Sequence, residues 1–196
     1  MKRMFFVIIA MAMMFAGGVQ QVYAKGKAAP VRALELEIGA GMVSPTNKLD
    51  FDKNRVGYNI NAELRCNFKT RPFDIGLRVD GGTFHRTLKL NKDLFKFRSL
   101  NVMAVFDWNI NRKGIFSPYL GVGIGGGLTS NQGMSIKDVA NQPFKETVSS
   151  AAFCVMPRVG VEIFHRARAT LYYKHIKDAN SHFGLSVGIV FGGGRT

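Results

Sequence analysis

Long apolar runs are absent after Ala16, although the chain has 196 residues. This absence excludes a protein built on transmembrane helices, because each such helix needs about 20 consecutive apolar residues. Cysteine is also scarce. The two cysteines cannot form a disulfide framework, and neither they nor the four histidines have the spacing of a metal site. We therefore expect no metal and no cofactor.

The first 24 residues contain a secretory signal. The basic pair Lys2-Arg3 precedes the apolar stretch from Met4 to Ala16, which is too short for a transmembrane helix. Small residues up to Ala24 follow, as a signal peptidase requires. The sequence predicts a signal peptide over 1–24, cleaved after Ala24, and then a short exposed leader over 25–31.

An exported chain without apolar helices can still span a membrane as a closed β-barrel. From Arg55 to Phe68, apolar or aromatic residues alternate without a miss with small, polar or charged ones. Successive side chains of a strand point to opposite faces, so this segment has one apolar and one polar face. It is longer than the usual ~5–6 residues of a soluble strand and suffices to cross a bilayer, which takes about 9–11.

Several other segments repeat this pattern. The sequence predicts eight strands, over 32–43, 55–68, 72–86, 95–110, 115–129, 148–164, 168–176 and 182–191. Tight turns are expected at 69–71, 111–114 and 165–167, and mostly longer links near 44–54, 87–94, 130–147 and 177–181. Short periplasmic turns and longer outer loops are typical of outer-membrane barrels. The predicted fold class is all-β, an eight-stranded antiparallel up-and-down transmembrane β-barrel over 32–191, followed by a short tail over 192–196.

The polar face of these strands would line the inside of the barrel. We expect it to form a polar network in the lumen, made of Glu35, Glu37, Glu63, Arg65, Asp74, Arg78, Asp80, Asp107, Arg158, Glu162 and Lys174. An eight-stranded barrel is only wide enough for side chains to fill, so each buried charge needs a partner. Glycines at 121, 123, 125 and 127 would make room for longer side chains. A salt-bridged plug is therefore favoured over an ion path.

Aromatic residues gather near the expected strand ends. The predicted aromatic girdles consist of Phe68, Phe73, Trp108, Phe116 and Phe191 towards the periplasmic ends, and of Tyr58, Phe153, Tyr173 and Phe183 towards the opposite ends. Such girdles mark the two membrane boundaries of outer-membrane barrels. Alternation alone does not say which face is outward, and a soluble lipocalin-like carrier would have its apolar face inside. Long strands, alternating link lengths and the missing disulfide framework favour the membrane barrel.

Two segments also resemble a known family. The stretch Ser117-Pro118-Tyr119-Leu120-Gly121-Val122-Gly123-Ile124-Gly125-Gly126-Gly127 and the closing strand from Phe183 to Phe191 are similar to small eight-stranded outer-membrane β-barrel proteins, of the OmpA/OmpX-like and opacity-protein type. The resemblance implies the outer membrane of a Gram-negative-type bacterium. It also implies that the outer-membrane assembly machinery reads a terminal aromatic residue, here Phe191, and that the barrel is a monomer. Family members serve as adhesins or structural anchors.

A second resemblance concerns the segment from Tyr173 to Asn180. It looks like the active-site strand of the outer-membrane lipid A deacylases, in which a histidine is followed two residues later by a serine. His175 matches the base position, but Lys177 occupies the nucleophile position and Ser181 and Ser186 are displaced. Alternation also points His175 towards lipid. We expect no enzyme and no catalytic residues, and lipid A hydrolysis is the enzymatic alternative.

The formal net charge of the chain is +14, and much of the excess lies in turns and rims, Arg168 included. Anionic lipid head groups are the expected counterions, above all lipopolysaccharide phosphates around the outer rim. The candidate contacts are Arg86, Lys89, Lys92, Lys96 and Arg98. Nucleic acid is not an expected partner, because the chain is exported and has no recognition motif.

Two local expectations complete the prediction. Cys66 and Cys154 fall on different faces of distant strands, so both should be free thiols. Pro157 lies inside a strand and has no amide hydrogen for the ladder, so we expect a β-bulge near 156–158.

The sequence thus predicts a non-enzymatic integral outer-membrane β-barrel with a filled polar lumen. Its role would be envelope integrity or adhesin-like surface contact through the extracellular loops. A lipid A-modifying hydrolase, a narrow porin-like channel and a soluble lipocalin-like carrier are the alternatives.

Overall fold

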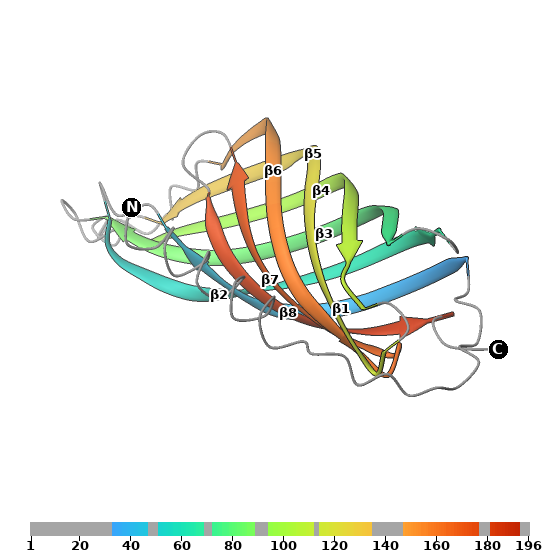
Figure 1. Cartoon of the computed structure of the whole chain (residues 1–196). Helices are drawn as coiled ribbons and strands as arrows, with labels where there is room; N and C mark the ends of the chain where they lie inside the picture. The colour runs from blue at the N-terminus through green and yellow to red at the C-terminus, as the bar shows by residue number, and fades with distance from the viewer. Residues whose placement is uncertain are drawn as a thin grey trace, which may run out of the picture.

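The computed structural model describes residues 33–46, 51–68, 72–88, 94–111, 114–134, 147–176 and 181–192. They form a closed barrel in which each strand pairs with its neighbours in chain order and β8 pairs with β1 (Figure 1). The strands are β1 (Leu34–Pro45), β2 (Phe51–Asn67), β3 (Phe73–Leu88), β4 (Leu94–Asn109), β5 (Phe116–Met134), β6 (Thr147–Ile163), β7 (Ala167–Ile176) and β8 (His182–Phe191). All pairs are antiparallel, so the predicted fold class is confirmed.

Some predictions fall on segments that the structure does not describe. The signal peptide, the leader over 25–31, the turn over 69–71 and all but the first residue of the 192–196 tail lie outside the described residues. Within the described part of the chain, no helix has the length and apolar character needed to cross a membrane.

The two ends of the barrel differ in their links. We call the end that carries Pro45, Leu88, Met134 and Ile176 the loop end, and the end at which Asn67, Asn109, Ile163 and Phe191 close their strands the turn end. Several strands extend further towards the loop end than the sequence predicts. β2 begins at Phe51 rather than at residue 55, and β5 runs to Met134 rather than to residue 129. Both extensions consist mostly of polar residues, so the apolar alternation that marks a strand in the sequence is missing there.

The strand registers determine the tilt of the strands relative to the barrel axis. Successive paired residues lead around the barrel from Val43 on β1 to Asn67, whose amide donates to the carbonyl of Ala33, so the shear is 43 − 33 = 10 residues. With eight strands, a rise of ~3.3 Å per residue and a spacing of ~4.7 Å, this shear corresponds to a strand tilt of roughly 40°. The lumen of the barrel is therefore narrow enough for side chains from opposite strands to contact each other.

The turn between β6 and β7 spans residues 164–166, one residue earlier than the expected 165–167. Phe164 (φ 54°) and His165 (φ 55°) both adopt left-handed backbone angles. Two consecutive positive φ angles match the twist of a tight hairpin, although glycine or asparagine usually supplies them. The sequence lacks these residues at the turn, which explains the shift of one residue.

The predicted bulge at Pro157 is wrong. Pro157 pairs with Val122 in an unshifted register along the whole of β5 and β6. The pairs between β6 and β7 keep one register on both sides, from Val155–His175 to Arg158–Tyr172, but omit the two residues in between. The missing amide hydrogen therefore faces β7 and is accommodated as a short gap in the ladder, with no shift of register.

The gap predicts a stabilising substitution. Pro157→Val should supply the missing donor to β7 and raise the free energy of unfolding by about 1 kcal/mol, the usual net contribution of one hydrogen bond. Urea unfolding of the barrel in detergent measures the change, and hydrogen exchange reports whether the new backbone amide at this position is protected. Exchange of this amide at the rate of a loop amide would contradict the assignment.

Candidate functional site

The interior of the turn-end half is a network of ion pairs centred on Glu63. Its carboxylate is fully buried, and the Nη1 atoms of four arginines lie within 4.0 Å of its oxygens. Arg158 is the nearest at 2.5 Å and Arg78 follows at 3.2 Å, with Arg65 and Arg168 at 3.7 and 4.0 Å. A single carboxylate therefore contacts cations from β3, β6, β7 and its own strand.

Arg158 joins this centre to β4. Its guanidinium donates to both oxygens of Glu63, at 2.5 and 2.8 Å, and to both oxygens of Asp107, at 2.9 and 2.8 Å. Bidentate pairing on two sides uses the planar fork that arginine alone provides. Arg158 thus bridges two carboxylates that would otherwise face each other in a narrow bore.

Arg168 belongs to the same network, although the sequence pattern assigned it to a rim. It is 2% exposed, donates to Asp107, and its Cζ lies 3.6 Å from the ring centroid of Tyr119. Arg168 directly follows the expected turn over 165–167 and was grouped with the rim charges, although alternation with Lys174 places it on the inward face. In the structure β7 begins at Ala167, and Arg168 points inward. With it, five bases face the seven acids of the predicted network.

Arg65 organises the carboxylates nearest the turn end. Its Nη1 lies 3.1 Å from Glu37, and its Nη2 lies 3.2 Å from Glu35 and 3.3 Å from Glu162. These three glutamates come from β1 and β6, on either side of the β7–β8 hairpin. Asp74, also buried here, accepts a hydrogen bond from the side-chain amide of Asn109.

A smaller group of charges lies nearer the loop end. Lys174 donates to both carboxylate oxygens of Asp80. Asp80 also accepts from Asn101 at 2.9 Å and lies 3.5 Å from Nε of Arg78. The structure thus places every charged residue that we expected in the lumen inside the barrel wall and connects most of them through direct contacts.

The glycines of β5 provide the room for this network. A Cβ added to Gly121 would collide with Asp107, and one added to Gly125 or Gly127 would collide with Met103 or Asn101. The inward face of β5 is therefore bare backbone between residues 121 and 127, and the longer side chains of β4 lie against it.

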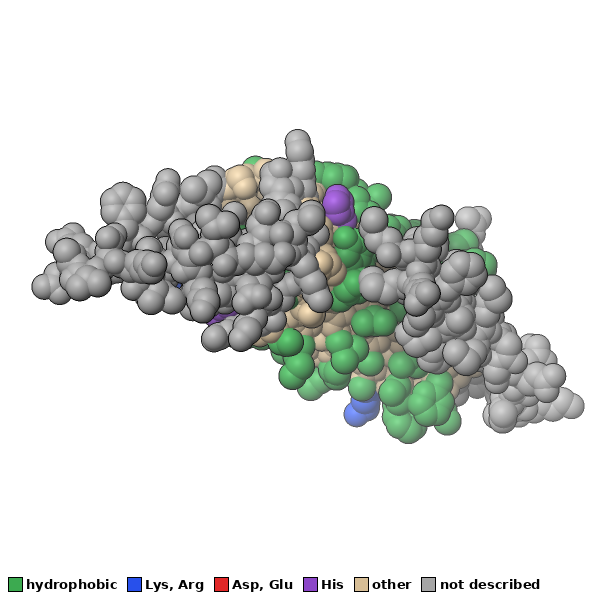
Figure 2. Space-filling model, turned by 90° about the vertical axis from the view of Figure 1, so that its left-hand side faces the viewer, with side chains coloured by type: hydrophobic (Ala, Val, Ile, Leu, Met, Phe, Trp, Pro, Cys, Tyr) green, Lys and Arg blue, Asp and Glu red, His purple; other side chains and the backbone are tan. Residues whose placement is uncertain are grey.

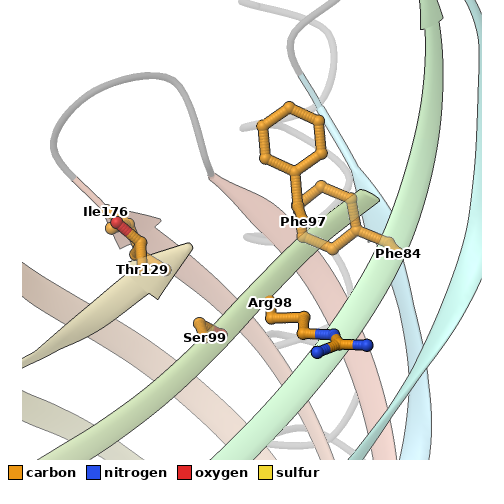
Figure 3. A pocket seen from close by; sticks show the side chains of 6 residues that line it. All are labelled: Phe84, Phe97, Arg98, Ser99, Thr129 and Ile176. Atoms are coloured by element: carbon orange, nitrogen blue, oxygen red, sulfur yellow. The ribbon is translucent and has the colours of Figure 1, made fainter. Parts of the chain in front are cut away.

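A group of apolar side chains also fills part of the lumen, mostly on the loop-end side of the ion pairs. We call this group the apolar cap; it consists of Val43, Phe84, Phe97, Met103, Val105, Ala152, Cys154, Met156, Tyr172 and Ile176. The rings of Phe84 and Phe97 are stacked with centroids 5.3 Å apart, and His182 lies 5.7 Å from Phe84. The two rings line a shallow pocket, which Ile176 and Thr129 border on the other side (Figure 3). The cap closes the charged half of the lumen from the loop end.

The outer surface of the barrel is apolar. Large hydrophobic side chains are exposed on all eight strands, with Ile60 at 66%, Leu77 at 53% and Leu185 at 54%, and they cover the visible wall (Figure 2). A folded protein in water does not expose a continuous surface of this kind. The apolar face points outward, so this is the surface of a barrel that spans a membrane.

The predicted aromatic girdle residues lie on this outer surface. Tyr58 on β2 and Phe68, the residue directly after β2, are both exposed and stand ten residues apart (68 − 58 = 10). At ~3.3 Å per residue and a tilt of roughly 40°, ten residues span about 25 Å along the barrel axis, the height of the apolar band in outer-membrane barrels. Phe73 contacts Trp108 near the turn end, and Tyr173 contacts Phe183 near the loop end, whereas Phe153 lies six residues inside β6. Their role as membrane boundaries stays a prediction.

The predicted head-group contacts are described only in part. Lys89 and Lys92 lie outside the described residues, and the side chain of Arg86 is not described either. Arg98 is exposed and Lys96 is half-exposed, both on the face of β4 that also carries the lipid-facing Leu100. These two cations therefore point outward just above the apolar belt.

A serine and a histidine meet at the loop end, although their spacing in the sequence did not predict it. Ser181 Oγ lies 3.1 Å from Nδ1 of His175, and it also accepts from the backbone amide of Ile176 at 3.3 Å. Ser181 is 3% exposed, whereas His175 is exposed on the lipid-facing side, as predicted. The serine thus joins the two ends of the β7–β8 link.

The two cysteines are free thiols, as predicted. Cys66 is exposed on the outer surface, and Cys154 is buried in the apolar cap. The two thiols therefore lie on opposite sides of the barrel wall.

Comparisons with known proteins give structural matches only. No family model matches the sequence, and no curated protein matches it. Among solved structures, one match is the crystal structure of Ail, the attachment invasion locus protein of Yersinia pestis, in complex with the heparin analogue sucrose octasulfate. The TM-score is 0.53 and the sequence identity is 16%, over 81% of this chain and 97% of Ail. A second Ail crystal structure has a TM-score of 0.53 and 18% identity over 80% and 98% of the two chains.

The chain has the fold of the small eight-stranded outer-membrane β-barrels. The crystal structure of Neisserial surface protein A also matches, with a TM-score of 0.48 and 15% identity over 82% of this chain and 97% of that one. At such low sequence identity, structural similarity shows the fold of this barrel alone. Its function must be argued from its own lumen and surface.

Proposed function

We propose that this protein is a non-enzymatic, non-conducting barrel of the outer membrane of a Gram-negative-type bacterium, which serves envelope integrity or surface contact through its loop end. The observation that carries the proposal is the filling of the lumen. Charged side chains pair across the turn-end half, and the apolar cap fills part of the lumen on the loop-end side. A barrel without a continuous hydrated bore anchors and presents its loops but does not transport.

Planar-bilayer recording tests the absence of a pore. The purified protein should give no discrete current steps in lipid bilayers, because ions would have to displace paired charges and cross the apolar cap. Reproducible unitary steps would favour the narrow porin-like alternative. Co-fractionation with outer membranes and a shift in gel mobility after boiling test the location and the closed barrel separately.

The buried thiol in the cap offers a direct test of the seal. In a Cys66→Ser background, Cys154 should resist a charged thiol reagent in the folded barrel, because it is fully buried. Replacing both Phe84 and Phe97 by alanine should raise the labelling rate on the order of tenfold, since the stacked rings lie over the cap. Mass spectrometry measures the labelling. A wild-type cap labelled as fast as unfolded protein would contradict the seal.

The outward cations at the loop end support lipid phosphates as the counterions of this barrel. Lys96 and Arg98 point towards the level at which head groups begin, just above Leu100. Ail, which has a similar fold, was crystallised in complex with a heparin analogue, so anion binding is compatible with a barrel of this fold. Basic side chains near an anionic membrane surface contribute about 1 kcal/mol each.

Lipid-dependent stability tests this contact. Replacing Lys96 and Arg98 by alanine should cost up to about 2 kcal/mol in bilayers that contain lipopolysaccharide and much less in bilayers of neutral phospholipid. Thermal unfolding in the two lipids, monitored by gel mobility, measures the difference. An equal loss in both lipids would mean that the cations stabilise the barrel itself, and protection by a sulfated polysaccharide alone would point to a different anion.

The contact between His175 and Ser181 is the one observation that favours the hydrolase alternative. Two features oppose it. The serine oxygen is already bonded to the backbone at Ile176, and it is almost fully buried, where a lipid ester could not reach it. We therefore assign the pair to holding the β7–β8 link. Unchanged lipid A acylation after expression of wild-type and Ser181→Ala protein would remove the hydrolase, and deacylation by the wild type alone would establish it.

A further inference from the structure

The turn between β6 and β7 is strained at both of its central residues. Phe164 (φ 54°) and His165 (φ 55°) are the two residues other than glycine with left-handed backbone angles in the described part of the chain. The amide of Arg166 donates to the carbonyl of Ile163 at 3.1 Å and closes the turn. A bulky side chain in the left-handed region is unfavourable, which is why such turns usually contain asparagine and glycine. Contacts of the two side chains must therefore offset the strain.

His165 makes such a contact inside the barrel. Its Nδ1 lies 3.4 Å from Oε1 of Glu162, and the other carboxylate oxygen of Glu162 lies 3.3 Å from Nη2 of Arg65. The side chain of His165 is only 13% exposed. The histidine therefore covers the ion network at the turn end, and the protein itself supplies the contact that offsets its strain.

Phe164 has the opposite surroundings. It is 65% exposed, more than any other phenylalanine whose side chain the structure describes. Packing within the barrel therefore does not offset the strain at this residue. A ring that is held in a strained turn and exposed has its partner outside the protein.

The lipid-facing surface of the barrel continues up to Phe164. The amide of Phe164 donates to the carbonyl of Ile115 at 2.8 Å, and the adjoining residues Phe116 and Ile163 form a register pair. Ile115 and Phe116 are exposed, at 56% and 58%. The turn thus forms the turn-end edge of the apolar outer surface.

A cation lies directly beside this apolar edge. Arg166, the last residue of the turn, is exposed. Aromatic rings favour the boundary between acyl chains and head groups, and arginine at that boundary reaches the phosphates. An exposed ring and an exposed guanidinium two residues apart therefore match the acyl and phosphate parts of one membrane lipid.

We propose that the β6–β7 turn binds an anionic phospholipid of the leaflet at the turn end. The ring of Phe164 lies against the acyl chains near the glycerol, and the guanidinium of Arg166 binds the phosphate. Removal of the ring from water offsets the strain of its left-handed backbone. This site lies at the opposite membrane surface from Lys96 and Arg98, and the inference does not depend on the function proposed above.

Brominated lipids test the proposal, because bromine quenches tryptophan fluorescence on contact. Trp108 is the only tryptophan of the chain, so Trp108→Phe combined with Phe164→Trp places the reporter in the turn. The vesicles consist of phosphatidylcholine with a minority of phosphatidylglycerol that is brominated near the glycerol. Quenching should correspond to an enrichment of phosphatidylglycerol around the reporter of about fivefold, the factor that ~1 kcal/mol per basic side chain gives.

Arg166→Gln in this background should lower the enrichment to about one. Lys96→Gln combined with Arg98→Gln is the matched control, because it removes two outward cations at the loop end and should leave the enrichment unchanged. The shift in gel mobility after boiling shows that each variant is folded. Ile115→Trp in the Trp108→Phe background, beside residue 164, is a second reporter for which the same result is expected.

Three results would overturn the proposal. Fluorescence that no brominated lipid quenches would place the turn in water. Equal quenching by brominated phosphatidylcholine and brominated phosphatidylglycerol at equal mole fractions would mean that the turn does not select an anionic lipid. Enrichment that persists in Arg166→Gln would mean that another cation binds the phosphate.

Discussion

Glu63→Gln should reduce the free energy of unfolding by about 3–5 kcal/mol, the loss observed when one partner of a buried ion pair is removed. The substitution keeps the volume of the side chain but removes its charge. Arg158 and Arg78, at 2.5 and 3.2 Å, would then face Arg65 and Arg168 without the carboxylate that separates them. Urea unfolding in detergent micelles, followed by tryptophan fluorescence and gel mobility, measures the change.

Glu162→Gln is the matched control. Glu162 also lies in the lumen and contacts Arg65 at 3.3 Å, but it stands at the turn end with 8% of its surface exposed, and Arg65 keeps three other glutamates, Glu35, Glu37 and Glu63. The control should cost about 1 kcal/mol or less. Equal losses for the two variants would mean that the network has no centre at Glu63.

Leu77→Arg is expected to destabilise the barrel by about 2–4 kcal/mol in a bilayer, because a lipid-facing arginine near the midplane has to be buried in hydrocarbon. Leu77 is 53% exposed on β3 and pairs with Leu64, which lies between the girdle residues Phe68 and Tyr58 on β2. Refolding into vesicles of defined lipid at increasing denaturant concentration measures the change.

Leu100→Arg tests whether this cost depends on depth. Leu100 is equally exposed, at 55%, but stands two residues from the outward-facing Arg98 at the loop end. Its substitution should cost only about 0–1 kcal/mol, since an arginine there reaches the head groups. A soluble carrier would show no such difference, and unchanged stability of Leu77→Arg would invert the assignment of the two faces.

Much of the architecture was predictable because it depends on short-range order. Alternation with a period of two assigns each strand residue to one face whatever its partners are. All eight strands were therefore located from the sequence, and the residues of the lumen were separated from those of the lipid-facing surface. The prediction failed beyond residue 129, where β5 continues through mostly polar residues and the apolar alternation is missing. It also failed at Arg168, which directly follows the expected turn and was assigned to a rim, although alternation with Lys174 places it in the lumen.

The candidate site was predictable as a list of charges but not as a set of contacts. The sequence places Glu63 and Arg158 on the polar face, yet they are 95 residues apart, and only the closure of the barrel makes them partners. The same holds for Lys174 and Asp80, 94 residues apart. Alternation with a period of two residues shows which face of the sheet a side chain lies on. It carries no information about which residue lies opposite it across the lumen.

The sequence by itself determined that this is an all-β chain whose strands have one apolar and one polar face, because both properties are local. The tertiary structure decided that the apolar face is outside, that Pro157 is accommodated by a gap rather than a bulge, and that Ser181 reaches His175. It also decided that the lumen is divided into an ion network and an apolar cap. These features depend on the shear of a closed barrel, which sets the heights at which side chains of distant strands meet.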